Sequence, residues 1–153
     1  MALYSTRTGS VALTASSTKS LWLLNPVTDF FVIAELSVAL DASAAAAGVG
    51  IELYRTTTLG TPAGTTATMT KVNRVGDAAS PTTTGLVNLT TEPTAVEILA
   101  DWFLQPFGGV LDIQYPLQRE PLGAAAGARI GLRYVTPAAV TPNCRAYVWY
   151  DER

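Results

Sequence analysis

Carboxylates are the side chains of this sequence best suited to catalysis, because two acids across a cleft suffice for glycoside hydrolysis. Candidate acids lie in segments that we expect to be strands: Glu35, Glu52, Glu97, Asp101 and Asp112. Each has polar or basic neighbours, so a surface position or an ion pair with arginine is the simpler interpretation. No spacing in the sequence brings two of these acids together. A carboxylate-pair hydrolase is therefore only weakly supported.

Other catalytic groups are scarce. The chain has no histidine, which removes the commonest general base and metal ligand. Ser16 to Lys19 matches the letters of a serine–lysine pair, but a solvated turn before a strand explains it more simply. Gly123 to Gly127 lacks the Lys-Ser/Thr ending of a phosphate loop. The lone Cys144 is expected to be a buried apolar residue of a strand. We predict no enzyme, no cofactor and no metal site.

Composition limits the kinds of partner. The 153 residues predict one domain, and only 14% of them are charged, against about 25% in a typical soluble domain. The formal net charge is −2 and the basic residues are scattered, so no nucleic-acid partner is expected. No apolar run approaches the ~20 residues of a membrane span and no secretory leader is apparent. We expect a protein that is made, and assembles, in the cytoplasm.

Proline and glycine interrupt short segments that are rich in β-branched and aromatic residues, which favours strands over helices. The predicted strands cover residues 11–15, 20–24, 30–40, 49–55, 65–75, 86–91, 94–104, 110–115, 129–135 and 145–150. The segment 94–104 also fits a helix face, but we predict a strand. The polar segment 65–75 is expected at an edge or against a partner. A short helical turn or a loop is expected at 41–48, a long loop at 76–85 and a turn at 137–142.

About eight short strands without a long helix predict an all-β fold. We expect a single-domain antiparallel β-sandwich, jelly-roll-like, over residues 11–153. Residues 1–10 are expected to be either an N-terminal arm that orders on binding or a frayed end. On the arm, Leu3, Tyr4 and Arg7 are candidate partner-interface residues.

Aromatic side chains stand out against the low charge. The most prominent are Trp22, Trp102, Trp149, Phe30, Phe31, Phe103, Phe107, Tyr147 and Tyr150. Most of them, Trp149 included, are expected in the core, and a few on outward faces would serve as interface anchors. For a carbohydrate face, Trp102 with Asp101 or Tyr54 with Glu52 would supply an aromatic ring and an acid. The predicted loop adds Thr82, Thr83 and Thr84 as candidate interface residues. An interaction or structural protein is the natural inference.

Several short sequence segments from residue 49 onward resemble segments of a family of small virion proteins of tailed bacteriophages, the capsid decoration or cement proteins. The segments are ELYRTT (52–57), TEPT (91–94), PFGG (106–109), YPLQRE (115–120), RIGLR (129–133) and RAYVWYDE (145–152). The resemblance is one of order and spacing, and it covers about two-thirds of the chain. Within it, Gly108 and Gly109 are expected to form a turn with positive φ, and Arg119 with Glu120 an ion pair or strand-end cap.

The resemblance implies a compact β-sandwich that associates as a homotrimer, binds the outer surface of an expanded capsid and braces its capsomers. The expected partner is the major capsid protein, with no nucleic acid, membrane or small-molecule substrate. The expected location is the outer surface of the virion capsid, after assembly in the host cytoplasm. The alternative is a receptor- or glycan-binding module of a head fibre or tail.

Overall fold

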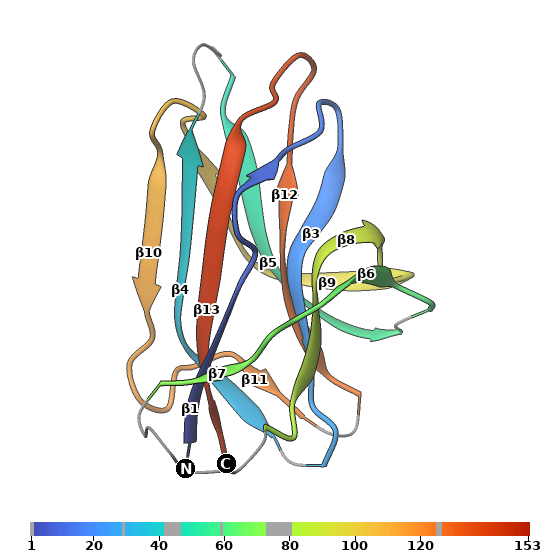
Figure 1. The fold of residues 1–153 in the computed structure, drawn as a ribbon, viewed down its shortest axis with the longest axis vertical. Coiled ribbons are helices and arrows are strands. Elements are labelled where there is room, and N and C mark those ends of the chain that lie inside the picture. Colours follow the sequence, from blue (N-terminus) through green and yellow to red (C-terminus); the bar gives the residue numbers. More distant parts are fainter. Residues whose placement is uncertain (1, 29, 42–46, 59, 73–80, 125–126) are drawn as a thin grey trace.

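Two antiparallel sheets packed face to face make up the protein (Figure 1). The computed structural model describes residues 2–28, 30–41, 47–58, 60–72, 81–124 and 127–153. These residues form thirteen strand segments and no helix. Eight of the segments have six or more residues. The predicted all-β, single-domain sandwich is confirmed.

The first sheet, which we call sheet A, is built around the last strand of the chain. Its strand order is β10 (Val110–Gln114), β4 (Phe31–Asp41), β13 (Asn143–Glu152), β1 (Ala2–Arg7) and β7 (Thr70–Lys71). Two short strands extend it, with β11 (Leu122–Gly123) paired to β4 and β2 (Val11–Ala12) paired to β13. Sheet A therefore has edges at β10 and β7.

The second sheet, sheet B, has six strands. Their order is β6 (Ala63–Thr66), β8 (Thr84–Thr91), β3 (Thr18–Asn25), β12 (Arg129–Val135), β5 (Val49–Thr58) and β9 (Ala95–Leu104). The chain passes from one sheet to the other between β2, β3, β4 and β5, between β6, β7 and β8, between β9 and β10, and between β11, β12 and β13. These crossings between sheets give the jelly-roll character that was predicted.

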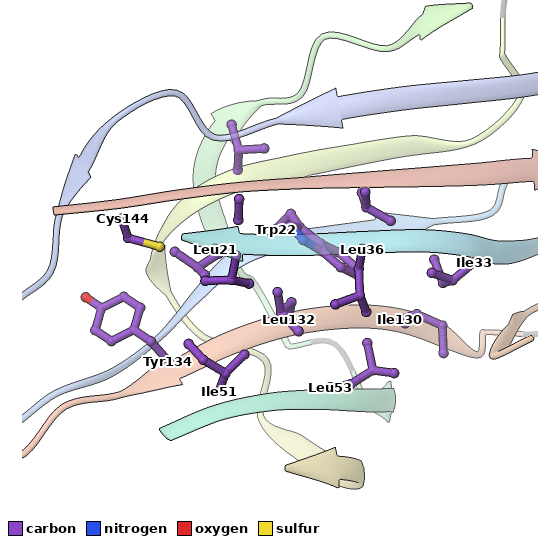
Figure 2. Packing of buried hydrophobic residues seen from close by; sticks show 14 of the residues in the cluster. Leu21, Trp22, Ile33, Leu36, Ile51, Leu53, Ile130, Leu132, Tyr134 and Cys144 are labelled. Carbon is purple, nitrogen blue, oxygen red and sulfur yellow. The ribbon is translucent and has the colours of Figure 1, made fainter. Parts of the chain in front are cut away.

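The core lies between the sheets and follows from strand alternation, because successive side chains point to opposite faces. In β4, Leu36 and Val38 are fully buried, and Trp22 of β3 is the largest buried side chain. Figure 2 shows these strands directing leucine, isoleucine and tryptophan side chains into one cluster. Cys144 lies in the same cluster at 1% exposure, which confirms its predicted burial. That burial raises the pKa of the Cys144 thiol to about 12.

The alternation of β13 corrects the prediction for Trp149. Cys144, Ala146, Val148 and Tyr150 of this strand are buried, so Trp149 lies on the opposite, outer face. The pairing with β4 has one extra residue, Ala34, beside Trp149, which leaves the alternation of β13 unchanged. Tyr150 is fully buried, whereas Trp149 is half-buried on the outer face. The expectation that Trp149 belongs to the core is wrong.

The predicted N-terminal arm differs most from the structure. Residues Ala2–Arg7 form β1, which pairs along its whole length with β13, from Ala2 opposite Glu152 to Arg7 opposite Tyr147. Tyr4 and Thr6 point inward and are buried. The segment is thus an integral strand of sheet A, because its backbone groups and its Tyr4 ring are satisfied within the fold.

Other sequence expectations have mixed outcomes. Segment 94–104 is a strand, β9, as predicted, and the polar segment 65–75 contributes the edge strands β6 and β7. Gly108 has the expected positive φ, whereas Gly109 does not. Glu120 pairs with Arg153 at 3.1 Å, not with Arg119. Residues 42–46 and 73–80, on which the predicted helical turn and part of the predicted loop fall, lie outside the described residues.

Candidate interaction surfaces

The outward face of sheet A carries a cluster drawn from three neighbouring strands. The Tyr147 hydroxyl donates a 2.6 Å hydrogen bond to Glu35 Oε1, and Gln114 Nε2 donates a 3.0 Å hydrogen bond to Glu35 Oε2. Trp149 lies beside Tyr147, with ring centroids 6.2 Å apart and tilted by 44°. Two half-buried aromatic rings and a carboxylate thus lie side by side on an exposed sheet face.

The pKa of the Tyr147 hydroxyl is raised in this cluster, so the group keeps its proton. Its hydrogen bond to the Glu35 carboxylate raises the pKa of the Tyr147 phenol, and partial desolvation and the negative charge of Glu35 raise it further. The hydroxyl is therefore a donor to Glu35 at neutral pH. Glu35 is held in place by two donors, which is a positioning role and not that of a free catalytic base.

A groove of about 530 Å³ opens next to this cluster. Its floor is made of small residues such as Ser37 and Ala39, and Tyr147, Arg7 and Arg145 stand at its sides. Tyr147 pairs with Ser37 across the strands but bonds to Glu35, two positions further along β4. The Tyr147 hydroxyl is thus directed along β4 toward Glu35, while its ring still lines the groove.

Arg7 and Arg145 are positively charged side chains of this surface that have no ion-pair partner among the described residues. Both are exposed, and neither guanidinium forms an ion pair or a side-chain hydrogen bond within the described part of the chain. Arg7 lies opposite Tyr147, and Arg145 lies two residues before Tyr147, so both project from the same face. We call the set Arg7, Glu35, Ser37, Ala39, Arg145, Tyr147 and Trp149 the sheet A face.

The free edge of sheet B forms a second surface. The Phe103 side chain is 82% exposed and Phe107, in the turn that leads to β10, is 69% exposed. Ile98 is 41% exposed, and Asp101 is exposed between it and Phe103. Glu97 is 71% exposed and only 3.9 Å from Arg55. We call the set Glu97, Ile98, Asp101, Phe103 and Phe107 the β9 side.

The end of the sandwich where the two chain termini lie (Figure 1) is a third surface. Exposed apolar side chains lie there on the connection between β3 and β4 and on the segment around β11: Val27 at 54%, Phe30 at 41%, Leu117 at 80% and Leu122 at 40%. The backbone is tied together by Arg153 N donating to Phe30 O and Ile33 N donating to Pro121 O, both at 3.0 Å. We call this set the terminal end.

The predicted interface residues fall on different parts of these surfaces. Tyr4 is 2% exposed and its ring stacks on Tyr150 at 5.7 Å, so it has no surface to offer a partner. Leu3 is half-buried and Arg7 belongs to the sheet A face. Thr83 is 3% exposed, whereas Thr84 is exposed and Thr82 half-buried. Tyr4 and Thr83 are therefore structural residues.

The threonine loop is anchored at the terminal end. Thr83 N and Thr82 N donate hydrogen bonds of 2.6 and 3.2 Å to the Glu152 carboxylate. Glu152 is the last residue of β13, so the central strand of sheet A fixes this loop. The loop thereby presents Thr84 in a defined position.

The acids predicted as catalytic candidates are distributed over both sheets. Glu52 and Asp101 are directly opposite each other on β5 and β9, a pairing that no sequence spacing revealed. However, Arg133 Nε lies 2.5 Å from Glu52 Oε2, so this acid is neutralised by a structural ion pair. Asp112 is opposite Ser37, next to the sheet A face.

The two predicted carbohydrate pairings are wrong. Tyr54 is 0% exposed, and therefore has no ring face free to stack on a sugar. Trp102 packs against the core cluster, whereas its neighbour Asp101 is exposed, because adjacent strand residues point to opposite faces. The aromatic and acidic groups that do meet on one face are Tyr147, Trp149 and Glu35, which come from strands distant in sequence.

Comparison with known proteins found no matching family model, no matching curated protein and no matching solved structure. Within the described ranges, no helix is long and apolar enough to cross a membrane. No group of three or more His, Cys, Asp or Glu side chains among those residues is placed to hold a metal ion.

Proposed function

We propose that this chain is a structural virion protein that binds the outer surface of a phage capsid as a homotrimer and braces its capsomers. The observation that carries this proposal is the terminal end, where four large apolar side chains are exposed on the loops at one end of the sandwich. Isolated apolar residues on a surface are ordinary, but clustered ones mark interaction sites. A protein surface of low charge is the partner that such a cluster fits.

Parts of the terminal end are tied to the strands by hydrogen bonds, which favours a docking role. Its loops are joined by backbone hydrogen bonds to Arg153 and Ile33, and the Glu120 carboxylate bonds Arg153. A preordered surface loses little conformational entropy on binding. Many copies on one shell would then give strong overall attachment from individually weak contacts.

The resemblance described above supports the same surface. The segment at residues 115–120 contains Leu117, and the segment at 145–152 ends in Glu152, which anchors the threonine loop. Both segments thus contribute to the terminal end.

Copy number is the first test of this function. We expect purified virions to contain this chain in numbers comparable to the major capsid protein, measured by quantitative mass spectrometry. A few tens of copies or fewer would move it to a fibre or tail, and absence from the particle would refute both virion roles.

A variant tests the surface itself. Leu117→Asp should abolish co-sedimentation with empty capsids, because it replaces the most exposed apolar side chain of the terminal end, at 80%, with a charge. The matched control is Ala138→Asp, which adds the same charge at an exposed position in the turn between β12 and β13, at the opposite end of β13. Equal binding by both variants would contradict the terminal end as the capsid surface.

A receptor- or glycan-binding module remains the second candidate, and one observation favours it. Tyr147 and Trp149 lie beside Glu35 and Gln114, and rings next to fixed hydrogen-bonding groups suit a sugar. Binding of the full chain to a glycan panel, lost in Trp149→Ala, would support this function. A receptor- or glycan-binding function also predicts few copies of the protein per particle.

A further inference from the structure

We infer that the β9 side of one copy binds the sheet A face of a second copy, and that this head-to-tail contact joins the protomers of the proposed trimer. The inference rests on the oligomeric part of the proposed function, not on the capsid contact. It assigns partners to two exposed surfaces that the terminal end does not use.

Charge is the first line of support. Arg7 and Arg145 of the sheet A face are exposed and lack ion-pair partners among the described residues. Asp101 of the β9 side is exposed, and Glu97 has only a 3.9 Å contact with Arg55. Glu35 also lies on the sheet A face and Asp112 is adjacent to it, and the two arginines of this face are the groups that can pair with the acids of the β9 side. Opposite potentials favour the encounter of two copies and fix their register.

Exposed apolar surface is the second line of support for this contact. Phe103 at 82% and Phe107 at 69% are the most exposed aromatic side chains of the β9 side. The groove of the sheet A face has small residues, Ser37 and Ala39, on its floor and the Tyr147 ring at its side. Phenylalanine, tyrosine and arginine are the residue types that dominate interface cores. A phenylalanine ring in this groove would be covered by aromatic and aliphatic atoms.

The exposed edge of β9 is the third line of support for this contact. β9 is hydrogen-bonded only to β5, so it is an edge strand of sheet B. An exposed edge with apolar side chains risks indiscriminate pairing, and covering it with another surface removes that risk. The sheet A face offers such a cover.

The two surfaces belong to different sheets, which determines the symmetry of the contact. A two-fold dimer uses the same surface on both copies, whereas a contact between two different surfaces is head-to-tail. Head-to-tail contacts form a ring when the rotation between successive copies closes. A closed trimer buries one β9 side and one sheet A face in every protomer.

Blocking each surface separately tests the contact. Phe103→Asp blocks the β9 side, and Arg145→Asp blocks the sheet A face. Both residues are exposed, so the melting temperature should change little. We expect light scattering after gel filtration to show a trimer for the full chain and monomers for both variants. The control Arg119→Asp, an exposed arginine away from both surfaces, should remain trimeric.

Mixing the two monomeric variants gives the decisive result. The Phe103→Asp chain keeps an intact sheet A face and the Arg145→Asp chain keeps an intact β9 side. One contact can therefore form between them but no ring. We expect the equimolar mixture to yield a one-to-one dimer, detected by chemical crosslinking and light scattering.

Three results would overturn the inference: a monomeric full chain at its highest soluble concentration, no dimer in the mixture, or loss of the trimer in only one of the two variants. A monomer whose sheet A face binds a glycan would favour the second candidate function instead. Capsid co-sedimentation with Leu117→Asp is independent of these measurements, so a failure of the capsid role and a failure of this contact can be told apart.

Discussion

The Tyr54 ring lies directly on the backbone of Gly131 in the neighbouring strand. A Cβ atom at position 131 would be 2.3 Å from Tyr54 Cζ, so only glycine leaves room for the ring. The Arg133 guanidinium lies 5.7 Å from the ring centroid, and the hydroxyl shares a 2.7 Å hydrogen bond with Ser20 Oγ. An aromatic residue on the outer face of sheet B is thereby completely buried.

Gly131→Ala should destabilise the protein by about 1–3 kcal/mol, because the new methyl group forces the Tyr54 ring out of its site. Urea denaturation followed by fluorescence measures the change. Gly48→Ala is the matched control, since its added Cβ would lie 3.4 Å from the nearest atom, an ordinary contact. Equal stability of the two variants would contradict the tight packing at Gly131.

Glu92→Ala should cost about 1–3 kcal/mol, the usual effect of removing a charged hydrogen-bond partner from a part-buried site. Glu92 accepts from the Ser20 backbone N–H at 2.8 Å and from the Ser20 hydroxyl, which in turn contacts Tyr54. Thermal denaturation measures the loss. Glu97→Ala, at an exposed acid, should change stability by less than about 0.5 kcal/mol, and a similar loss in both would argue against the Glu92 network.

Trp22→Ala should cost about 3–5 kcal/mol, because it removes the largest fully buried side chain of the core. Trp149→Ala should cost less than half of that, since its indole is half-buried on the outer face. The free energies of unfolding of the two variants, measured under the same conditions, give the comparison. Equal losses of unfolding free energy in the two variants would indicate that Trp149 is buried in the core.

Stability should fall as the pH rises above about 9. Burial raises the pKa of the Cys144 thiol from 9.0 to about 12, and it also raises the pKa of the Tyr54 and Tyr150 phenols. The folded protein therefore keeps protons that the unfolded chain loses, so stability is full below the unfolded pKa values and declines toward the folded ones. Each such group contributes a slope of about 1.4 kcal/mol per pH unit.

Melting temperatures between pH 8 and pH 11 test this decline. Cys144→Ala removes the thiol, so its melting temperature should fall less steeply with pH than that of the unchanged chain. The Cys144 thiol should also resist alkylation at pH 8 in the folded protein and react after unfolding. A flat profile to pH 11 would contradict the raised pKa values.

The sequence predicts the long strands well, because alternation in β4, β5 and β12 reflects a core on one side. It fails for β1, where the inward residues are the small Ala2, the aromatic Tyr4 and the polar Thr6, a pattern too short and mixed to indicate a strand. That strand is stabilised by its pairing with β13 at the far end of the chain. No local pattern reports such a pairing.

The surfaces were less predictable than the fold. The sequence indicates Glu35 as a candidate acid, but its hydrogen-bond donors Gln114 and Tyr147 come from two other strands. Trp149 was misplaced because Tyr147 and Trp149 are as apolar as the inward residues Val148 and Tyr150, so either face could have been the buried one. The charge of Arg145 is the signal that settles it, because the alternation of β13 is uninterrupted and Arg145 shares a face with Tyr147 and Trp149.

The central position of β13 has a consequence for biosynthesis. This strand separates β4 from β1 in sheet A, yet it is the last strand of the sandwich to leave the ribosome. Until then β1 and β4 have no partner at their shared position, and their edges are open to other nascent chains. Sheet A is therefore completed only after β13 has been synthesised, and its rate of formation is limited by contacts between strands far apart in the sequence. Yield during expression should be more sensitive to changes in β13 than to changes in any other strand.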